Sequence, residues 1–226
     1  QFPLEANVAG HFTVLDDRQG AELMAEARAS VFHIAETKPD SAFGRALAAV
    51  IDLMSDAGVE KALDELIQNR DAFRRWTADE GDLETALSHL ATDLGVRPGT
   101  NLRDLDRRFR DEAVLDELAS RRAAEILGSG SKTDQAKADQ LIQAWKLSDP
   151  EAFKDYWLPI FLTAKLEPRK SLATKKIVES APDVVEQLEA EQARLMDLLQ
   201  ERRLAVTFAG TAALLRLADA VITHYE

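Results

Sequence analysis

The chain has 226 residues, of which 40 are Asp or Glu and 28 are Lys or Arg, so its formal net charge is −12. This charge favours solubility and argues against a surface that is basic all over, although it leaves room for a local basic patch. The absence of cysteine excludes disulfides and thiol chemistry, and the four histidines show no metal-ligand spacing.

The first stretch, residues 1–14, has no helical period, and we expect extended chain entering the fold there. Asp16 and Asp17 then favour a helix start, because a carboxylate at that position accepts hydrogen bonds from the free N–H groups of the first turn. Apolar residues recur after them at spacings of three and four, which predicts a helix with one apolar face ending near Thr37: Met24, Ala27, Val31 and Ile34.

Three further helices are predicted before residue 100. The first begins after Asp40 or Ser41 and is expected to stop at Gly58, and the second covers 59–67. Arg70 and Arg74 follow with helical spacing, so they could either contact a phosphate or form a solvated face. A leucine-rich helix over 83–94 then ends before the Pro98–Gly99 turn.

The charge pattern in the middle of the chain predicts one long helix, capped by Thr100 or Asn101 and reaching Leu127. Its exposed arginines are balanced by acidic residues. The segment 128–132 reads GSGSK, which is a flexible hinge or a plain loop. Two more helices are expected, over 133–147 and from Asp149–Pro150 onward.

The stretch 161–176, FLTAKLEPRKSLATKK, does not keep a helical period, and Pro168 forbids a continuous helix through it. We expect an extended excursion or a small hairpin near 162–177. Five basic residues stand here against Glu167 alone, a local net charge of +4 in an acidic chain: Lys165, Arg169, Lys170, Lys175 and Lys176. These side chains are candidates for contacts with the phosphates of DNA, and the alternative is a solvated loop.

The last stretch, 182–226, has Pro182 at its start and Gly210 as its only glycine, which predicts one long helix, with a kink at Gly210 as an option. Its first half has an apolar stripe that Gln192 interrupts, and its second half is apolar nearly all round, as in a core helix. Its longest uncharged run is too short for a membrane span.

No internal repeat of fixed period and no catalytic motif occurs in the sequence, neither a phosphate-binding Gly-rich loop nor a nucleophile elbow nor a zinc-binding His-Glu-x-x-His. We therefore expect that the chain itself neither hydrolyses ATP nor cuts DNA, and that it holds no cofactor or metal. Because it begins at Gln1 and not at a methionine, we expect an excised or processed piece of a longer protein.

Three stretches together resemble one family. The opening FPLEANVAGHFTVLDD, the later FLTAKLEPRKSLATKK and the ending LLRLADAVITHYE are similar, in the same order, to segments of the AddA-type subunits of bacterial ATP-dependent helicase–nucleases. Residues 40–150 carry little that matches. The resemblance implies that the chain is the 1B accessory subdomain, inserted within the first motor domain of a superfamily 1 helicase of the UvrD/RecB/AddA group.

The resemblance implies a set of partners that lie outside this chain. The parent protein would bind ATP and Mg²⁺ through motifs upstream of Gln1 and downstream of Glu226, would pair with an AddB-type subunit, and would act on duplex ends or forks in the cytoplasm. The fold expected from the residues is all-α, with about eight to ten helices in a single subdomain. The competing function is a non-catalytic α-helical protein-interaction module without a nucleic-acid role.

Overall fold

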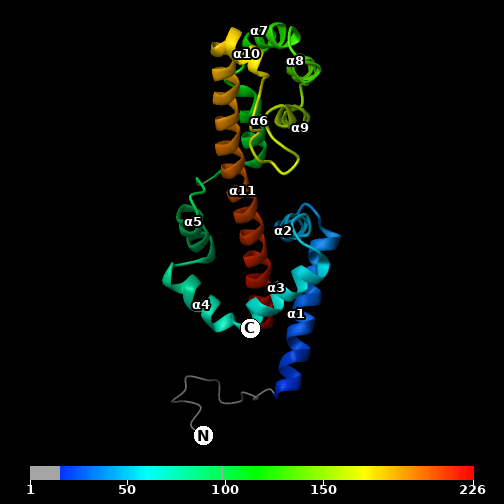
Figure 1. The fold of residues 1–226 in the computed structure, drawn as a ribbon. Helices are drawn as coiled ribbons and strands as arrows, with labels where there is room; N and C mark the ends of the chain where they lie inside the picture. Colours follow the sequence, from blue (N-terminus) through cyan, green and yellow to red (C-terminus); the bar gives the residue numbers. More distant parts are fainter. Residues whose placement is uncertain (1–15, 98) are drawn as a thin grey trace. The chain divides into compact units, whose positions relative to one another are not determined.

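The computed structural model describes residues 16–97 and 99–226, and over these residues it contains eleven α-helices and no strand. The all-α prediction is confirmed, with slightly more helices than expected (Figure 1). In chain order the helices are α1 (Asp17–Thr37), α2 (Ala42–Ile51), α3 (Asp56–Gln68), α4 (Arg70–Asp79), α5 (Leu83–Asp93), α6 (Leu102–Asp111), α7 (Glu117–Gly128), α8 (Lys132–Ala144), α9 (Pro150–Phe161), α10 (Lys175–Ser180) and α11 (Pro182–Tyr225). The opening stretch 1–15, expected to be extended, lies outside the described residues.

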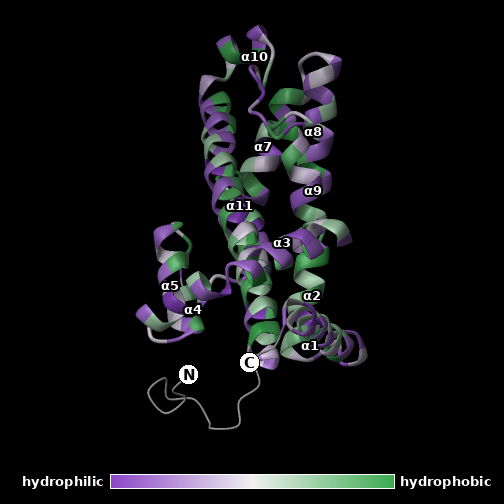
Figure 2. Cartoon of the chain, turned by 90° about the horizontal axis from the view of Figure 1, so that it is seen from below, coloured by the Kyte–Doolittle hydropathy of each residue, from purple (hydrophilic) through white to green (hydrophobic). Residues whose placement is uncertain are grey.

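The chain divides into two compact units, one formed within the described residues by 16–90 and 208–226 and the other by 91–207. The boundaries fall within α5 and α11 and do not coincide with the 128–132 segment considered as a hinge. Each unit has a helical core of its own. In both, polar and apolar residues alternate around the helices, as the two colours of Figure 2 show.

The first unit is built where α1, α2, α3 and α4 bury their apolar faces with the last turns of α11. Its helix starts follow the expected chemistry: Asp16 forms a capping box with Gln19, and Ser41 accepts from the Gly44 N–H at 3.0 Å. The best buried members of this core are Val50, Leu63, Leu217, Ala218, Val221 and Ile222.

The predicted end of the second helix at Gly58 is wrong. Helix α2 already ends at Ile51, and Gly58 lies inside the first turn of α3, where its N–H donates to the hydroxyl of the cap Ser55. Glycine occurs near both the first and the last turn of helices, so Gly58 alone does not distinguish the start of α3 from the end of α2.

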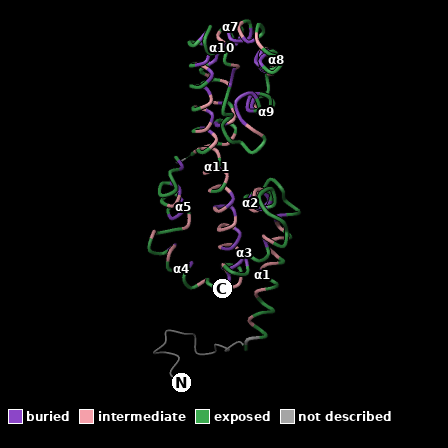
Figure 3. The backbone as a smooth tube through the Cα atoms, viewed as in Figure 1, coloured by how far each residue is buried: buried purple, intermediate pink, exposed green. Residues whose placement is uncertain are grey.

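The second unit is organised around aromatic side chains of α9 and of Trp145, the residue directly after α8. Trp157 stacks on Phe153 with ring centroids 5.1 Å apart, and Trp145 meets Phe153 edge-on at 5.4 Å. Phe153, Trp157 and Phe161 are fully buried, and much of α9 is drawn in the buried colour in Figure 3.

The prediction of a single long helix reaching Leu127 is also wrong, because the helix is interrupted between α6 and α7. Asp116 caps α7 by accepting from the Ala119 N–H at 2.8 Å, and Leu115 is buried in the break. The Val114 N–H, which a continuous helix would have used internally, donates instead to the carboxylate of Glu191 on α11 at 2.8 Å.

Helix α11 runs from Pro182 to Tyr225, which confirms the long C-terminal helix. By length and composition it could cross a membrane, since its most apolar 18-residue stretch has a mean hydropathy of 1.6. Half of that stretch is buried inside the protein, a property that core helices of soluble proteins share.

Candidate nucleic-acid interface

The candidate site is the loop between α9 and α10, which we call the basic loop and define as residues 162–174, with Lys175 and Lys176 directly after it. Its first part forms a narrow turn closed by an antiparallel bridge between Leu162 and Pro168. The Thr163 N–H donates to Glu167 O at 2.8 Å, and the Leu166 N–H donates to Thr163 O at 2.9 Å. Of the two expected alternatives, the extended excursion is present, and an isolated bridge stands where a hairpin would have had two strands.

One side of the basic loop is held by α11. The amide Nε2 of Gln192 donates to the carbonyl oxygens of Phe161 at 2.7 Å and of Arg169 at 3.1 Å, so one side chain ties together both arms of the turn. Gln192 is the polar residue that interrupts the apolar stripe of this helix. Its role was missed from the sequence, where only the break in the stripe signalled it.

The other side is held by α8. Asp134 accepts from the backbone N–H of Thr174 at 3.2 Å and from its hydroxyl at 2.8 Å, while it also closes a capping box with Ser131. Lys137 donates its ammonium to Ser171 O at 3.4 Å and to Leu172 O. Both side chains are almost fully buried, although Asp and Lys are rarely buried without partners. The basic loop is therefore attached to two helices by buried polar groups.

The pKa of each anchor is lowered, but for different reasons. Burial raises the pKa of Asp134, but the hydrogen bonds from Thr174 and Ser131 outweigh it and hold the pKa below its ordinary value. Burial and the nearby Arg169 cation lower the pKa of Lys137, and the charge of Asp134 opposes them in part.

All five predicted contact residues, Lys165, Arg169, Lys170, Lys175 and Lys176, are exposed, and the loop between α9 and α10 is drawn mostly in the exposed colour in Figure 3. They differ in their partners. Arg169 donates from Nε at 3.1 Å and from Nη2 at 2.9 Å to Pro159 O, and so caps the end of α9. Lys175 lies 3.8 Å from Glu179, whereas the other three lysines form no ion pair among the described residues.

The other candidates for phosphate contacts, Arg70 and Arg74, already have partners within the protein. Arg74 donates to Asp219 at 2.7 Å, to the Thr223 hydroxyl at 2.9 Å and to Glu226 at 2.8 Å. The guanidinium of Arg70 lies 5.7 Å from the ring centre of Tyr225. Both arginines therefore join α4 to the end of α11 within the first unit, which leaves the basic loop as the better candidate for phosphates.

No group of three or more His, Asp or Glu side chains suited to a metal ion occurs in the described part of the chain. The comparisons with known proteins add no relative: no family model, no curated protein and no solved structure matches this chain.

Proposed function

We propose that this chain is a DNA-contacting accessory subdomain of an ATP-dependent helicase–nuclease of the AddA type, which acts on DNA ends in double-strand-break repair and recombination. The observation that carries the proposal is the construction of the basic loop and the first turn of α10, in which polar side chains of α8 and α11 anchor the loop and five cations are exposed. Because the loop is already anchored, it loses little conformational freedom on binding, and its cations can bind an anionic ligand at a low entropic cost.

Two features of the sequence point to a phosphate ligand. The basic loop concentrates positive charge in a chain of net −12, and it coincides with one of the stretches that resemble the AddA family. A helicase must move along any sequence, so its contacts should go to the phosphate backbone and not to base edges. In this proposal ATP, Mg²⁺ and the AddB-type partner belong to the rest of the parent protein. Of the other two similar stretches, residues 214–226 supply core side chains to the first unit, and the opening one lies mostly outside the described residues.

The test is binding of this chain to a blunt-ended DNA duplex at low ionic strength, measured by fluorescence anisotropy. A triple variant, Lys165→Gln, Lys170→Gln and Lys176→Gln, removes the three lysines without ion pairs. We expect lower affinity and a flatter salt dependence, by about 0.9 in the slope of log K against log salt for each phosphate that the variant no longer neutralises. The matched control removes three other exposed lysines, Lys61→Gln, Lys132→Gln and Lys146→Gln. Equal decreases in affinity for both variants would contradict the proposal.

The second candidate function is a protein-interaction module. It is favoured by the exposed apolar residues around the α2–α3 turn, Ile51, Leu53 and Met54, which are 37 to 47 % exposed. This function predicts no duplex binding that depends on the basic loop, so the same experiment separates the two candidates.

A further inference from the structure

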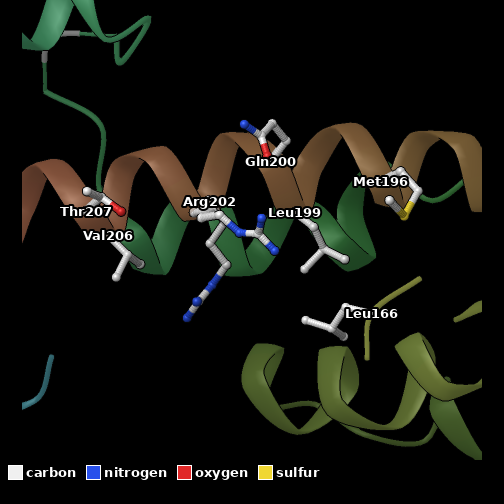
Figure 4. Close-up of a pocket in the computed structure, with 8 residues that line it drawn as sticks. Leu166, Met196, Leu199, Gln200, Arg202, Val206 and Thr207 are labelled. Carbon is white, nitrogen blue, oxygen red and sulfur yellow. The ribbon is translucent and has the colours of Figure 1, made fainter. Parts of the chain in front are cut away.

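A groove of about 310 Å³ lies beside the basic loop in the second unit, between Leu166 at the loop tip and one face of α11 (Figure 4). The helix residues recur at spacings of three and four, so they share one face. The groove is lined by Leu166, Met196, Leu199, Gln200, Arg202, Arg203, Val206 and Thr207.

The lining combines apolar walls with positive charge. Leu166, Met196, Leu199 and Val206 supply the apolar surface, and the lining holds two arginines and no carboxylate. Arg202 is committed to Asp106, to which its Nε donates at 2.7 Å. Arg203 is exposed and forms no ion pair among the described residues, so its charge remains available to an anionic ligand.

The backbone at Leu166 adds an independent observation. Its φ is +59°, a left-handed conformation that glycine adopts freely but that is sterically unfavourable for a leucine. Leu166 is nevertheless 42 % exposed, so burial in the core does not explain the leucine. Its side chain does form the wall of the groove opposite Met196 and Leu199, as Figure 4 shows.

We propose that this groove receives one unstacked nucleobase of single-stranded DNA, with the base packed between Leu166 and the apolar residues of α11 and its phosphate near Arg203 and Lys165. The proposal rests on the proposed function, because the same basic loop must bring the strand to the groove. Every base has an apolar face, and apolar side chains, leucine and methionine among them, serve to separate stacked bases in other DNA-binding proteins.

Size and charge favour this occupant over a protein segment. The volume is at the lower end of the roughly 300–1,000 Å³ typical of small-ligand sites, and an α-helix about 10–12 Å across is too bulky for a site of this volume. The face of a base is apolar and its phosphate is anionic. The base therefore suits the aliphatic side chains of the lining, and the phosphate suits Arg203, which has no ion pair among the described residues.

The test compares three probes bound by this chain at low ionic strength: an oligo-dT strand, a strand of the same length made of abasic sites, and a blunt duplex. We expect tighter binding to oligo-dT than to the abasic strand. Leu166→Ala and Leu166→Gly should each weaken binding of oligo-dT by roughly five- to tenfold, because less apolar surface then packs against the base, while affinity for the abasic strand and the duplex stays unchanged.

Two exposed residues of the same unit give matched controls. Leu118 on α7 is 78 % exposed, and Leu118→Ala should change no affinity. Arg203→Gln should flatten the salt dependence of single-strand binding by about 0.7, whereas Arg107→Gln, at an exposed arginine paired with Asp104, should not. Leu166 and Arg203 are both exposed, and circular dichroism of each variant verifies that the helices are retained.

The outcomes separate this inference from the proposed function. Equal affinity for oligo-dT and the abasic strand, with duplex binding that still depends on the loop lysines, overturns the base-binding groove alone. Base-dependent single-strand binding without loop-dependent duplex binding overturns the proposed duplex contact and leaves the groove. If the chain binds no DNA, both are wrong. If Leu166→Ala changes the oligomeric state in sedimentation velocity and leaves DNA binding unaltered, the groove is a protein interface and the inference is wrong.

Discussion

The indole Nε1 of Trp157 donates a 2.7 Å hydrogen bond to Oε1 of Glu191, and neither side chain is exposed to solvent. The same carboxylate accepts from the Val114 N–H at 2.8 Å and from Arg194 at 2.6 and 2.9 Å. Arg194 in turn donates to the carbonyl oxygens of Arg108 and Phe109 at the end of α6. One buried acid therefore joins α9, α11 and the break between α6 and α7.

Replacing Glu191 should destabilise the second unit strongly. Glu191→Ala leaves an indole N–H and a backbone N–H without their acceptor and takes the carboxylate away from the Arg194 guanidinium. We therefore expect a decrease of about 3–5 kcal/mol in the free energy of unfolding, measured by urea titration. The control Glu189→Ala, at an exposed position on the same helix, should stay within about 0.5 kcal/mol of the unmodified chain. Similar values for the two variants would show that the buried network is not needed.

The second prediction concerns Gln192. Gln192→Ala removes the two hydrogen bonds to Phe161 O and Arg169 O and should release the basic loop without unfolding the unit. Hydrogen exchange of a peptide spanning 162–174 should accelerate, because the amides of Thr163 and Arg169 are no longer protected by the closed turn. Gln187→Ala, on the same helix, should leave the exchange unaltered. Unchanged exchange in Gln192→Ala would mean that α8 alone holds the loop.

These two residues show what sequence patterns contain and what they omit. The sequence predicts a helix boundary correctly where residues close in the chain determine it. Pro182 marks the start of α11, Asp16 caps α1, and Pro168 interrupts the helical pattern. The break between α6 and α7 was not predicted, because the carboxylate that accepts from Val114 lies 77 positions later in the chain. The candidate cations could be selected by composition, whereas their anchors Asp134 and Lys137 lie on another helix and carry no local signal.

The third prediction compares two helical glycines of the chain. A Cβ on Gly44 would meet the backbone of Lys38 and Pro39, with Lys38 O at 2.5 Å and Pro39 Cα at 2.6 Å, and backbone cannot move aside. Gly44→Ala should therefore lower the unfolding free energy by about 1–3 kcal/mol. A Cβ on Gly210 would meet only the side chain of Leu53, which is 45 % exposed and can rotate into solvent.

Gly210→Ala should then leave the unfolding free energy unchanged or raise it by up to about 1 kcal/mol, because alanine favours a helix over glycine. Thermal unfolding followed by circular dichroism distinguishes the two variants. A destabilisation in Gly210→Ala as large as in Gly44→Ala would mean that Leu53 is held in place.

The fourth prediction concerns acid. Burial raises the pKa of Asp106, but the hydrogen bonds and charges of Arg202 and Lys154 outweigh it and place the pKa below its ordinary value of 3.8. A carboxyl with a lowered folded-state pKa binds fewer protons when folded, so its contribution to stability is complete above pH 3.8 and is lost as the pH falls through the folded-state value.

Asp106→Asn should consequently reduce the unfolding free energy at pH 7, and the difference from the unmodified chain should shrink steadily as the pH falls below about 4. Urea titrations at a series of pH values measure it. A difference that stays constant from about pH 7 to about pH 3 would show that the charge of Asp106 is not what matters at this position.

The last prediction separates two roles of Arg169, which caps α9 through Pro159 O and also belongs to the proposed DNA-contacting set. Arg169→Lys keeps the positive charge but loses the planar fork that donates twice to one carbonyl. The salt dependence of duplex binding should therefore be retained, while hydrogen exchange over 162–174 accelerates. Lys170→Gln, one residue along and without an ion pair among the described residues, should do the reverse: the salt slope falls by about 0.9 and the exchange stays the same. If Arg169→Lys instead flattens the salt dependence as much as Lys170→Gln does, the geometry of the guanidinium, and not its charge alone, contacts the phosphate.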